Sequence, residues 1–132
     1  MSFRKIRKLT NSFKDKNTSI DVFNDCNKLN HDIKRFFFIT SKKKQIRGNH
    51  AHKVCFQTII CVVGSVRVFL DDGSKKQIIS LNNNKKILTI PPLTWSYQYY
   101  ETNSQILVLC SEKFHEKDYI RNYDTFKKII KK

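Results

Sequence analysis

Short runs of β-branched and aromatic residues, separated by turn residues, make up most of this 132-residue chain. Apolar runs and two-residue alternation predict strands at 19–23, 33–40, 47–53, 54–63, 66–70, 77–81, 87–90, 95–100 and 105–111. Asp71-Asp72-Gly73 predicts a hairpin between two of these strands, and Gly64-Ser65 predicts another. Many short strands with a turn signal about every ten residues are typical of an all-β sandwich or small barrel.

The two ends of the chain follow different patterns. The apolar positions of the tail recur at helical spacing, at Tyr119, Tyr123, Phe126 and Ile130, which predicts a C-terminal helix near 118–131. Near the start, 15–19 is interpreted as a turn and 24–32 as a loop. The length suits one core, so residues 1–132 are interpreted as a single domain.

Composition narrows the class of protein. The chain is 39% hydrophobic, and its longest apolar run is interrupted by Gln57, which argues against a membrane span. The four cysteines, Cys26, Cys55, Cys61 and Cys110, form no CxxC pair and are expected to be reduced. Together with the absence of a secretory-signal pattern at the start, they indicate a cytoplasmic protein.

A net charge of +15 raises the question of an anionic partner. Nucleic acid is one candidate, and salt-dependent retention of DNA would support it. The lysines, however, are spread over several turns without regularly interleaved aromatic residues, which favours a solvated surface. We therefore expect neither a nucleic-acid nor a membrane partner.

The most distinctive stretch is RGNHAHK, residues 47–53. In a strand, His50 and His52 lie two residues apart and point to the same face. Two imidazoles on one face need polar partners to be buried, so the pair suggests a cavity. A histidine in a strand is nevertheless more often structural, and an HxH pattern also occurs by chance.

Metal binding and proton transfer are the two kinds of chemistry open to this histidine pair. Barrel proteins of the cupin type bind a metal through HxH, a carboxylate and a later histidine, but Gln57 and Ser96 stand here instead, so we expect no metal. A neutral imidazole, with a reference pKa of about 6.5, suits proton transfer between adjacent carbons through an enediol.

Nearby residues suit a nucleotide-linked ligand. Arg35 and Arg47 have the bidentate geometry that a pyrophosphate requires, although a surface ion pair is the alternative for Arg35. Trp95 could stack on a nucleobase or pack in the core.

Several segments together resemble the dTDP-sugar 3,4-ketoisomerases of the WxcM-like group. They are RGNHAHK with Gln57, GSVRVFLDDG (64–73), IPP with Trp95, VLCSE (108–112) and DYIRNYDTF (118–126), in a match running from about Ile33 to Ile130. RGxH alone is shared with the sugar 3,5-epimerases, so an epimerase-like enzyme is one alternative. A catalytically inactive cupin that binds a nucleotide sugar is another.

The resemblance implies a cupin jelly-roll β-barrel with a short C-terminal helix, and a homodimer that exchanges N-terminal strands. It implies a cofactor-free and metal-independent isomerase that converts dTDP-4-keto-6-deoxyglucose to its 3-keto isomer. The product would supply a 3-amino sugar for surface glycans such as the lipopolysaccharide O-antigen.

The resemblance also assigns roles to individual residues. His50 is the lead base and His52 its partner. The expected substrate-binding positions are Arg35, Arg47, Gln57, Asn49, Lys53, Phe37, Trp95, Ser96 and Asn17.

Three positions depart from the family pattern. Phe37 and Phe38 stand where members usually carry tyrosine, so a hydroxyl is missing. Asn17 replaces an arginine, and Ser96 replaces a histidine or arginine. The last two changes leave the configuration of the product at carbon 4, galacto or gluco, open.

Overall fold

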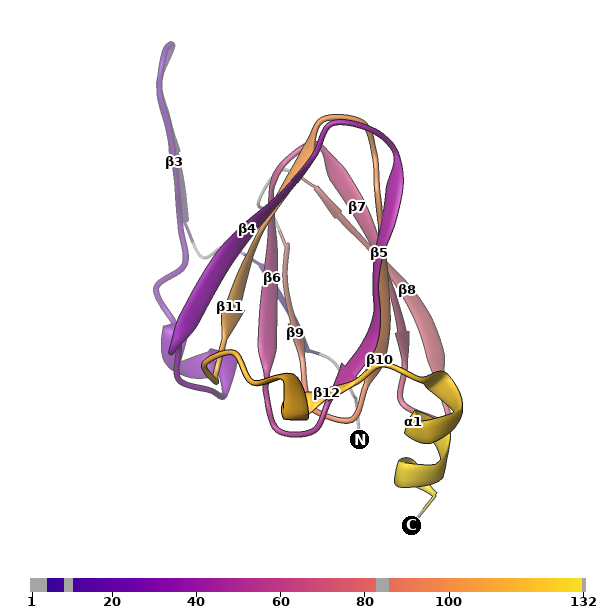
Figure 1. Cartoon of the computed structure of the whole chain (residues 1–132). Coiled ribbons are helices and arrows are strands. Elements are labelled where there is room, and N and C mark those ends of the chain that lie inside the picture. The colour runs from indigo at the N-terminus through magenta and orange to yellow at the C-terminus, as the bar shows by residue number, and fades with distance from the viewer. Residues whose placement is uncertain (1–4, 9–10, 83–85, 132) are drawn as a thin grey trace.

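The computed structural model describes residues 5–8, 11–82 and 86–131, which form two five-stranded antiparallel sheets, a separate hairpin and one C-terminal α-helix (Figure 1). The first sheet has the order β1 (Lys5–Lys8), β9 (Lys86–Ile90), β6 (Gln57–Val63), β11 (Ser104–Cys110) and β4 (Arg35–Ser41). The second has the order β12 (Tyr119–Ile120), β5 (Gln45–His52), β10 (Trp95–Tyr100), β7 (Ser65–Asp71) and β8 (Lys76–Asn82). The all-β jelly roll with a short C-terminal helix is therefore confirmed.

The main core lies between the two sheets. On β7, Val66 and Val68 are buried while Arg67 between them is exposed, as two-residue alternation requires. Ile106 and Val108 of β11 enter the same cluster from the opposite sheet. Full burial of each such side chain contributes about 1.5–3 kcal/mol to folding, which explains why alternation marks the inner face of strands such as β7.

One hairpin prediction is confirmed and the other is wrong. β7 and β8 pair across Asp71-Asp72-Gly73, with Asp71 opposite Lys76. β6 and β7, however, belong to different sheets, so Gly64 turns a corner between sheets instead of closing a hairpin. A turn signal shows where a chain changes direction, but long-range pairing decides which sheet the next strand joins.

The C-terminal helix is shorter than predicted. A 3₁₀ turn at Glu116–Asp118 and strand β12 precede it, and helix α1 runs only from Tyr123 to Ile130. It begins there because Asn122 caps it, accepting a hydrogen bond from the Thr125 amide at 2.9 Å. Fully buried Phe126 anchors the helix in a second cluster with Ala51 of β5 and Trp95 of β10, on the outer side of these strands.

Other expectations were met in part. The stretch 24–32 contains a 3₁₀ turn at Cys26–Leu29, and β6 begins at Gln57, later than the predicted 54. The Asn82-Asn83-Asn84 stretch, which separates the strands predicted at 77–81 and 87–90, lies partly outside the described residues. All four cysteines are free, three of them buried and Cys26 exposed. Among the described residues, no helix has the length and hydrophobicity that crossing a bilayer requires.

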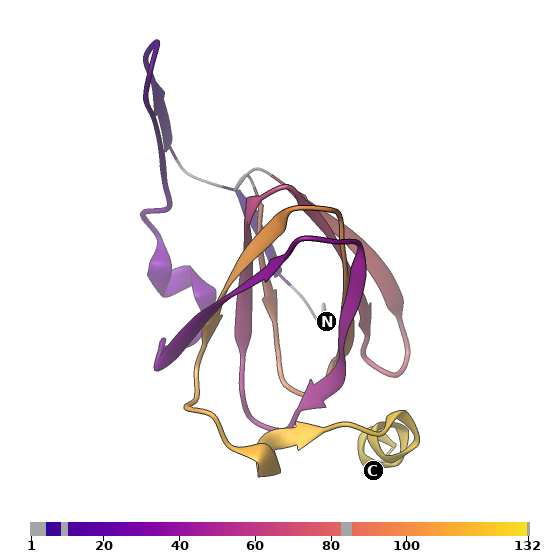
Figure 2. The same cartoon turned by 45° about the horizontal axis from the view of Figure 1, so that its top comes forward.

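Strands β2 (Asn11–Lys14) and β3 (Ser19–Val22) form a hairpin that projects away from the body (Figures 1 and 2). Its predicted turn is confirmed, because one oxygen of the Asp15 carboxylate accepts the amides of Asn17 and Thr18 at 2.8 and 2.7 Å. Phe13 and Ile20 are 58% and 54% exposed on this arm. The arm therefore presents apolar side chains that its own chain leaves uncovered.

Candidate active site

A β-bulge in β5 brings an arginine and a histidine to the same face. Gly48 and Asn49 both have positive φ, and the register with β10 shifts so that Arg47 pairs with Gln98 while His50 pairs with Ser96. Paired residues in antiparallel strands share a face, so the extra residue places Arg47 and His50 together although they are three positions apart. Without the bulge they would point to opposite faces.

That face is the inner one. Ser96 and Gln98 are 3% and 8% exposed, and they pair on their other side with the core residues Leu70 and Val68. β12 pairs with the end of β5, so that Tyr119 lies opposite His52. The predicted shared face of the two histidines is confirmed, because the His50 and His52 ring centroids lie 5.1 Å apart.

The two histidines have different partners. Nδ1 of buried His52 lies 2.7 Å from a carboxylate oxygen of Asp118, and the other oxygen accepts the Val54 amide at 2.7 Å. Burial opposes ionisation of Asp118, but these hydrogen bonds hold its pKa below the usual value. Nε2 of His52 makes no hydrogen bond to any described residue. The carboxylate thus orients the His52 ring and leaves Nε2 available for another group.

His50 is held in its neutral form. Burial, followed by the positive charge that His52 can carry, lowers the pKa of His50 from 6.5 to about 4. The ring of Tyr119 packs against both histidines, with centroid distances of 5.1 Å to His50 and 4.5 Å to His52. The Arg121 guanidinium lies 4.3 Å from the centroid of the Tyr119 ring and forms an ion pair with Glu116. A neutral imidazole is the form that can accept a proton.

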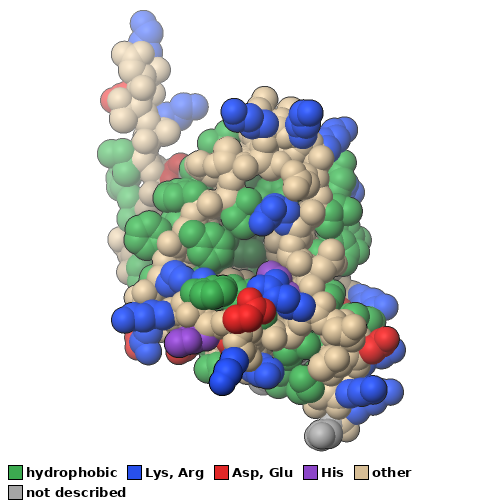
Figure 3. Space-filling model, viewed as in Figure 1, with side chains coloured by type: hydrophobic (Ala, Val, Ile, Leu, Met, Phe, Trp, Pro, Cys, Tyr) green, Lys and Arg blue, Asp and Glu red, His purple; other side chains and the backbone are tan. Residues whose placement is uncertain are grey.

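The opposite sheet adds a cation and an aromatic ring. On β4, Arg35 and Phe37 face inward, with the guanidinium 5.5 Å from the Phe37 ring centroid. Burial works to lower the pKa of Arg35, but a hydrogen bond with Tyr119 outweighs it and the pKa is raised. The Arg35 Nε also donates a hydrogen bond to the Glu112 carbonyl at 3.2 Å. Figure 3 shows the hollow on this face, with a histidine at its edge and charged side chains beside it.

Gln57 also faces the interior, but its amide is already engaged. It is 9% exposed, and Nε2 donates to the sulfur of Cys110 at 3.6 Å. Among the described residues, with Ser96 in place of a third histidine, the inner face offers two imidazoles and an amide that is already hydrogen-bonded. This set does not fit the metal that other cupins hold through HxH.

Several predicted site residues do not join the histidines. Trp95 precedes the inward-facing Ser96 in β10 and therefore points to the outer face. There it packs on Phe126, with ring centroids 5.7 Å apart. Of its two interpretations, the structure supports core packing. Asn17 lies at the end of the projecting arm, away from its own site. Asn49 in the bulge of β5 and Lys53 just after β5 are both exposed.

Two residues of the site were missing from the sequence-based set, Asp118 and Tyr119. Both lie in the DYIRNYDTF segment, which the helical spacing of Tyr119 and Tyr123 assigned to a helix. The signal that could have revealed them is the Asp-Tyr pair preceding an Asn cap, because Asn122 marks where the helix begins. Only the pairing of β12 with β5 brings them to His52.

An antiparallel jelly roll with paired histidines and two arginines at one opening defines a cupin-type protein. The FdtA family (WxcM-like, C-terminal) matches residues 2–131. The chain therefore belongs to the FdtA family, which confirms the resemblance seen in the sequence.

Similar proteins with named activities agree. Over 102 residues the chain is 41% identical to the TDP-4-oxo-6-deoxy-alpha-D-glucose-3,4-oxoisomerase of Aneurinibacillus thermoaerophilus, covering 76% of this chain and 73% of the relative. The crystal structure of QdtA, a sugar 3,4-ketoisomerase from Thermoanaerobacterium thermosaccharolyticum in complex with TDP, matches with a TM-score of 0.87 at 35% identity, covering 98% of this chain and 95% of QdtA. A histidine-to-asparagine mutant of QdtA in complex with TDP-4-keto-6-deoxyglucose matches with a TM-score of 0.87 at 34% identity, covering 99% and 96%.

Proposed function

We propose that this chain is a 3,4-ketoisomerase that moves the keto group of TDP-4-keto-6-deoxyglucose from carbon 4 to carbon 3. The named activities of its relatives and the match of the fold over nearly the whole chain support this proposal. The observation that carries it is the inward-facing pair of imidazoles, 5.1 Å apart, with one ring neutral and the other held by a carboxylate.

The reaction needs two proton transfers, one from carbon 3 to carbon 4 and one from the oxygen on carbon 3 to the oxygen on carbon 4. The C3–H bond lies next to the C4 carbonyl, so a base can remove this proton and leave an enediolate. Transfer of the O3 proton to O4 and protonation at C4 then place the carbonyl at C3 and a hydroxyl at C4. No atom or electron is gained or lost, so the isomerisation requires no oxidant.

His50 is the proposed base. Its lowered pKa keeps the ring neutral near pH 7, with a lone pair available for the C3 proton. His52 is the proposed partner, because the Asp118 carboxylate bonds to its Nδ1 and orients the ring while Nε2 faces no described hydrogen-bond partner. A neutral base beside a carboxylate-supported acid is the arrangement that separates the two roles.

The surrounding side chains fit the rest of the substrate. Arg35 and Arg47 approach the opening from opposite sheets and are proposed to bind the diphosphate. Gln57, Ser96 and the exposed Lys53 and Asn49 complete the proposed contacts. Phe37 supplies no hydroxyl, so we assign the proton transfers at oxygen to the histidines.

A second copy of the chain is part of the proposal. The β2–β3 arm carries exposed Phe13 and Ile20 and has Asn17 at its turn. We propose a homodimer in which this arm packs on the partner and brings Asn17 to the partner's opening. The proposed setting is the cytoplasm, where an aminotransferase would use the 3-keto product for a 3-amino sugar of a surface glycan such as the O-antigen.

The decisive experiment is proton NMR of the chain with TDP-4-keto-6-deoxyglucose in deuterated water. We expect a 3-keto product and exchange of the carbon-3 proton. Deuterium at carbon 5 would instead support a 3,5-epimerase-like reaction. Tight TDP binding without turnover would show a nucleotide-sugar-binding protein that lacks catalysis.

The matched variant is His50→Asn. It should abolish carbon-3 exchange while TDP binding and the oligomeric state persist, because only the proposed base is removed. His115→Asn, which changes an exposed histidine in a loop, should retain full activity. Full activity of His50→Asn would reject the assignment of the base.

A further inference from the structure

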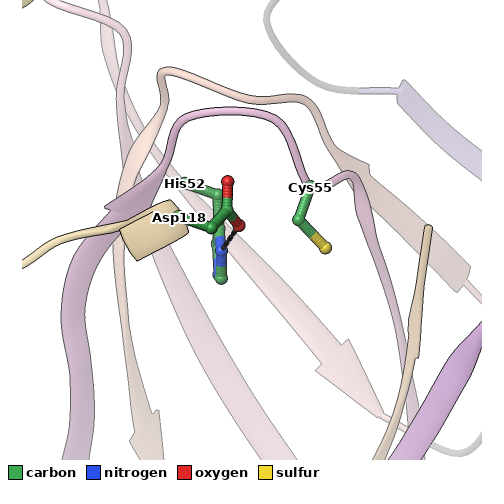
Figure 4. Close-up of side chains that lie close together, drawn as sticks. All are labelled: His52, Cys55 and Asp118. Atoms are coloured by element: carbon green, nitrogen blue, oxygen red, sulfur yellow. Dashed lines mark hydrogen bonds and ion pairs between the residues drawn. The ribbon is translucent and has the colours of Figure 1, made fainter. Parts of the chain in front are cut away.

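A cysteine lies close to the His52–Asp118 pair. Cys55 is in the turn between β5 and β6 and is only 1% exposed. His52, Cys55 and Asp118 each offer one ligand atom, and these atoms all lie within 4.8 Å of one another. Figure 4 shows the three side chains flanking this turn, with the His52–Asp118 hydrogen bond dashed.

These donors form a mixed set. An imidazole nitrogen, a thiolate sulfur and a carboxylate oxygen together suit zinc, whereas magnesium and calcium prefer oxygen ligands alone. Tetrahedral zinc, with bonds of about 2.0–2.3 Å, separates its ligand atoms by roughly 3.3–3.8 Å. The observed cluster therefore needs only small side-chain shifts to surround such an ion, with the fourth position left open.

The three side chains are buried to different degrees. The Cys55 sulfur is enclosed and donates to the Phe56 carbonyl at 3.2 Å. The His52 and Asp118 side chains are 6% and 12% exposed, so an ion would enter from the side of Asp118.

We propose that His52, Cys55 and Asp118 form a binding site for a zinc-like divalent ion. Binding replaces the hydrogen bond between His52 and Asp118 and releases the Cys55 thiol proton to solvent. The site excludes His50 and differs from the HxH arrangement of metal-binding cupins. Because the ion holds the proposed acid, it inhibits the isomerase; this consequence rests on the proposed function.

Cobalt(II) is the probe, because a cobalt–thiolate bond gives a charge-transfer band in the near ultraviolet. Metal-free, full-length chain is titrated with Co²⁺ without substrate. We expect the band in the wild type and in Cys26→Ala, the matched control with an exposed cysteine, and its loss in Cys55→Ala. Zn²⁺ should displace cobalt, whereas Mg²⁺ should not.

Absence of the band in the wild type, or its persistence in Cys55→Ala, overturns the site. Circular dichroism checks that Cys55→Ala is folded; if it is not, Asp118→Asn decides, and it should weaken Co²⁺ binding by about tenfold or more. Unchanged cobalt affinity in Asp118→Asn also overturns the site.

The consequence for catalysis is tested separately. Zn²⁺ should inhibit the wild type and Cys26→Ala at concentrations about tenfold or more below those needed for Cys55→Ala. Cobalt binding without inhibition would keep the site and overturn its link to the reaction. Because the cobalt spectrum needs no substrate, an inactive chain with the band would reject the isomerase and not the site.

Discussion

Two histidines separated by a single alanine have different chemical surroundings in this protein. His50 is largely buried beside a group that can become positive, which lowers its pKa to about 4. His52 has a carboxylate at 2.7 Å on its Nδ1 side. A pair of titratable groups whose environments differ in this way is suited to act as base and acid in one reaction.

The Asp118 carboxylate is predicted to position and support His52. In Asp118→Asn the negative charge is lost and the tautomer of His52 is no longer fixed, so kcat should fall by about 100-fold. KM should change little, because Asp118 is not assigned to substrate binding. The pH profile of kcat should also shift, which a purely structural role would not cause.

Asp124→Asn is the control for this prediction, since Asp124 is an exposed carboxylate in the first turn of α1. It should leave both kcat and the pH profile unchanged. An unaltered kcat in Asp118→Asn would show that the hydrogen-bonded pair of His52 and Asp118 does not take part in catalysis.

The lowered pKa of His50 also predicts how stability depends on pH. In the unfolded chain the ring binds a proton below about pH 6.5, whereas in the folded chain it does so only near pH 4. The unfolded state therefore binds more protons than the folded state between these two pH values. The contribution of His50 to the free energy of unfolding is thus fully present above pH 6.5 and is lost as the pH falls toward 4.

Urea unfolding at a series of pH values measures this loss. His50→Asn should show a shallower decline in the free energy of unfolding between pH 6.5 and 4 than the wild type. Parallel curves for the two proteins would contradict the prediction.

At the level of a single element, the bulge of β5 decides which residues the site contains. It inserts Asn49 opposite a continuous β10, and Gly48 adopts φ +101° to make this possible. The strand then presents Arg47, His50 and His52 to the interior, a set that strict alternation does not allow.

Gly48→Ala should therefore damage both stability and activity. A Cβ atom there would lie 3.0 Å from the Cα of Tyr97, and L-residues rarely adopt this φ, so the strain costs about 1–3 kcal/mol. The displaced bulge moves Arg47 relative to His50, so kcat/KM should fall as well. Thermal unfolding and steady-state kinetics measure the two effects.

Gly73→Ala is the matched control, because Gly73 also has positive φ but lies in the β7–β8 turn. It should lose stability and keep kcat/KM. Equal losses of activity in both variants would mean that the bulge has no special role in the site.

At the level of the whole molecule, the projecting arm is the feature that one copy of the chain does not explain. Two five-stranded sheets bury their inner faces against each other, whereas Phe13 and Ile20 remain more than half exposed on an isolated hairpin. A two-stranded hairpin is marginal by itself, so a partner is expected to stabilise it.

The proposed homodimer predicts that Phe13→Asp shifts the protein from dimer to monomer and reduces activity, because the arm would no longer bring Asn17 to the partner's opening. Sedimentation equilibrium measures the oligomeric state. Ile78→Asp is the control, because Ile78 is 59% exposed on β8, at the edge of the second sheet and outside the arm. It should leave the dimer intact. A monomeric wild type, or dissociation by Ile78→Asp alone, would refute the exchanged arm.

Most strands were predictable because alternation is a local consequence of burying one face, as Val66, Arg67 and Val68 illustrate. The shared face of His50 and His52 followed from the same rule. Sheet membership at Gly64 and the start of α1 were predicted wrongly, because both depend on contacts between segments far apart in the chain. Trp95 had two interpretations, and only the position of α1 over it favoured packing.

The sequence by itself determined the fold class, the histidine pair and the family, because periodicity, turn chemistry and motif order are properties of neighbouring residues. Tertiary structure alone decided that Asp118 and Tyr119 join His52, that Arg47 shares the face of His50, and that Cys55 lies beside the dyad. The physical reason is that strand register and a one-residue bulge set these distances, and both are fixed by the packing of two sheets rather than by any single segment.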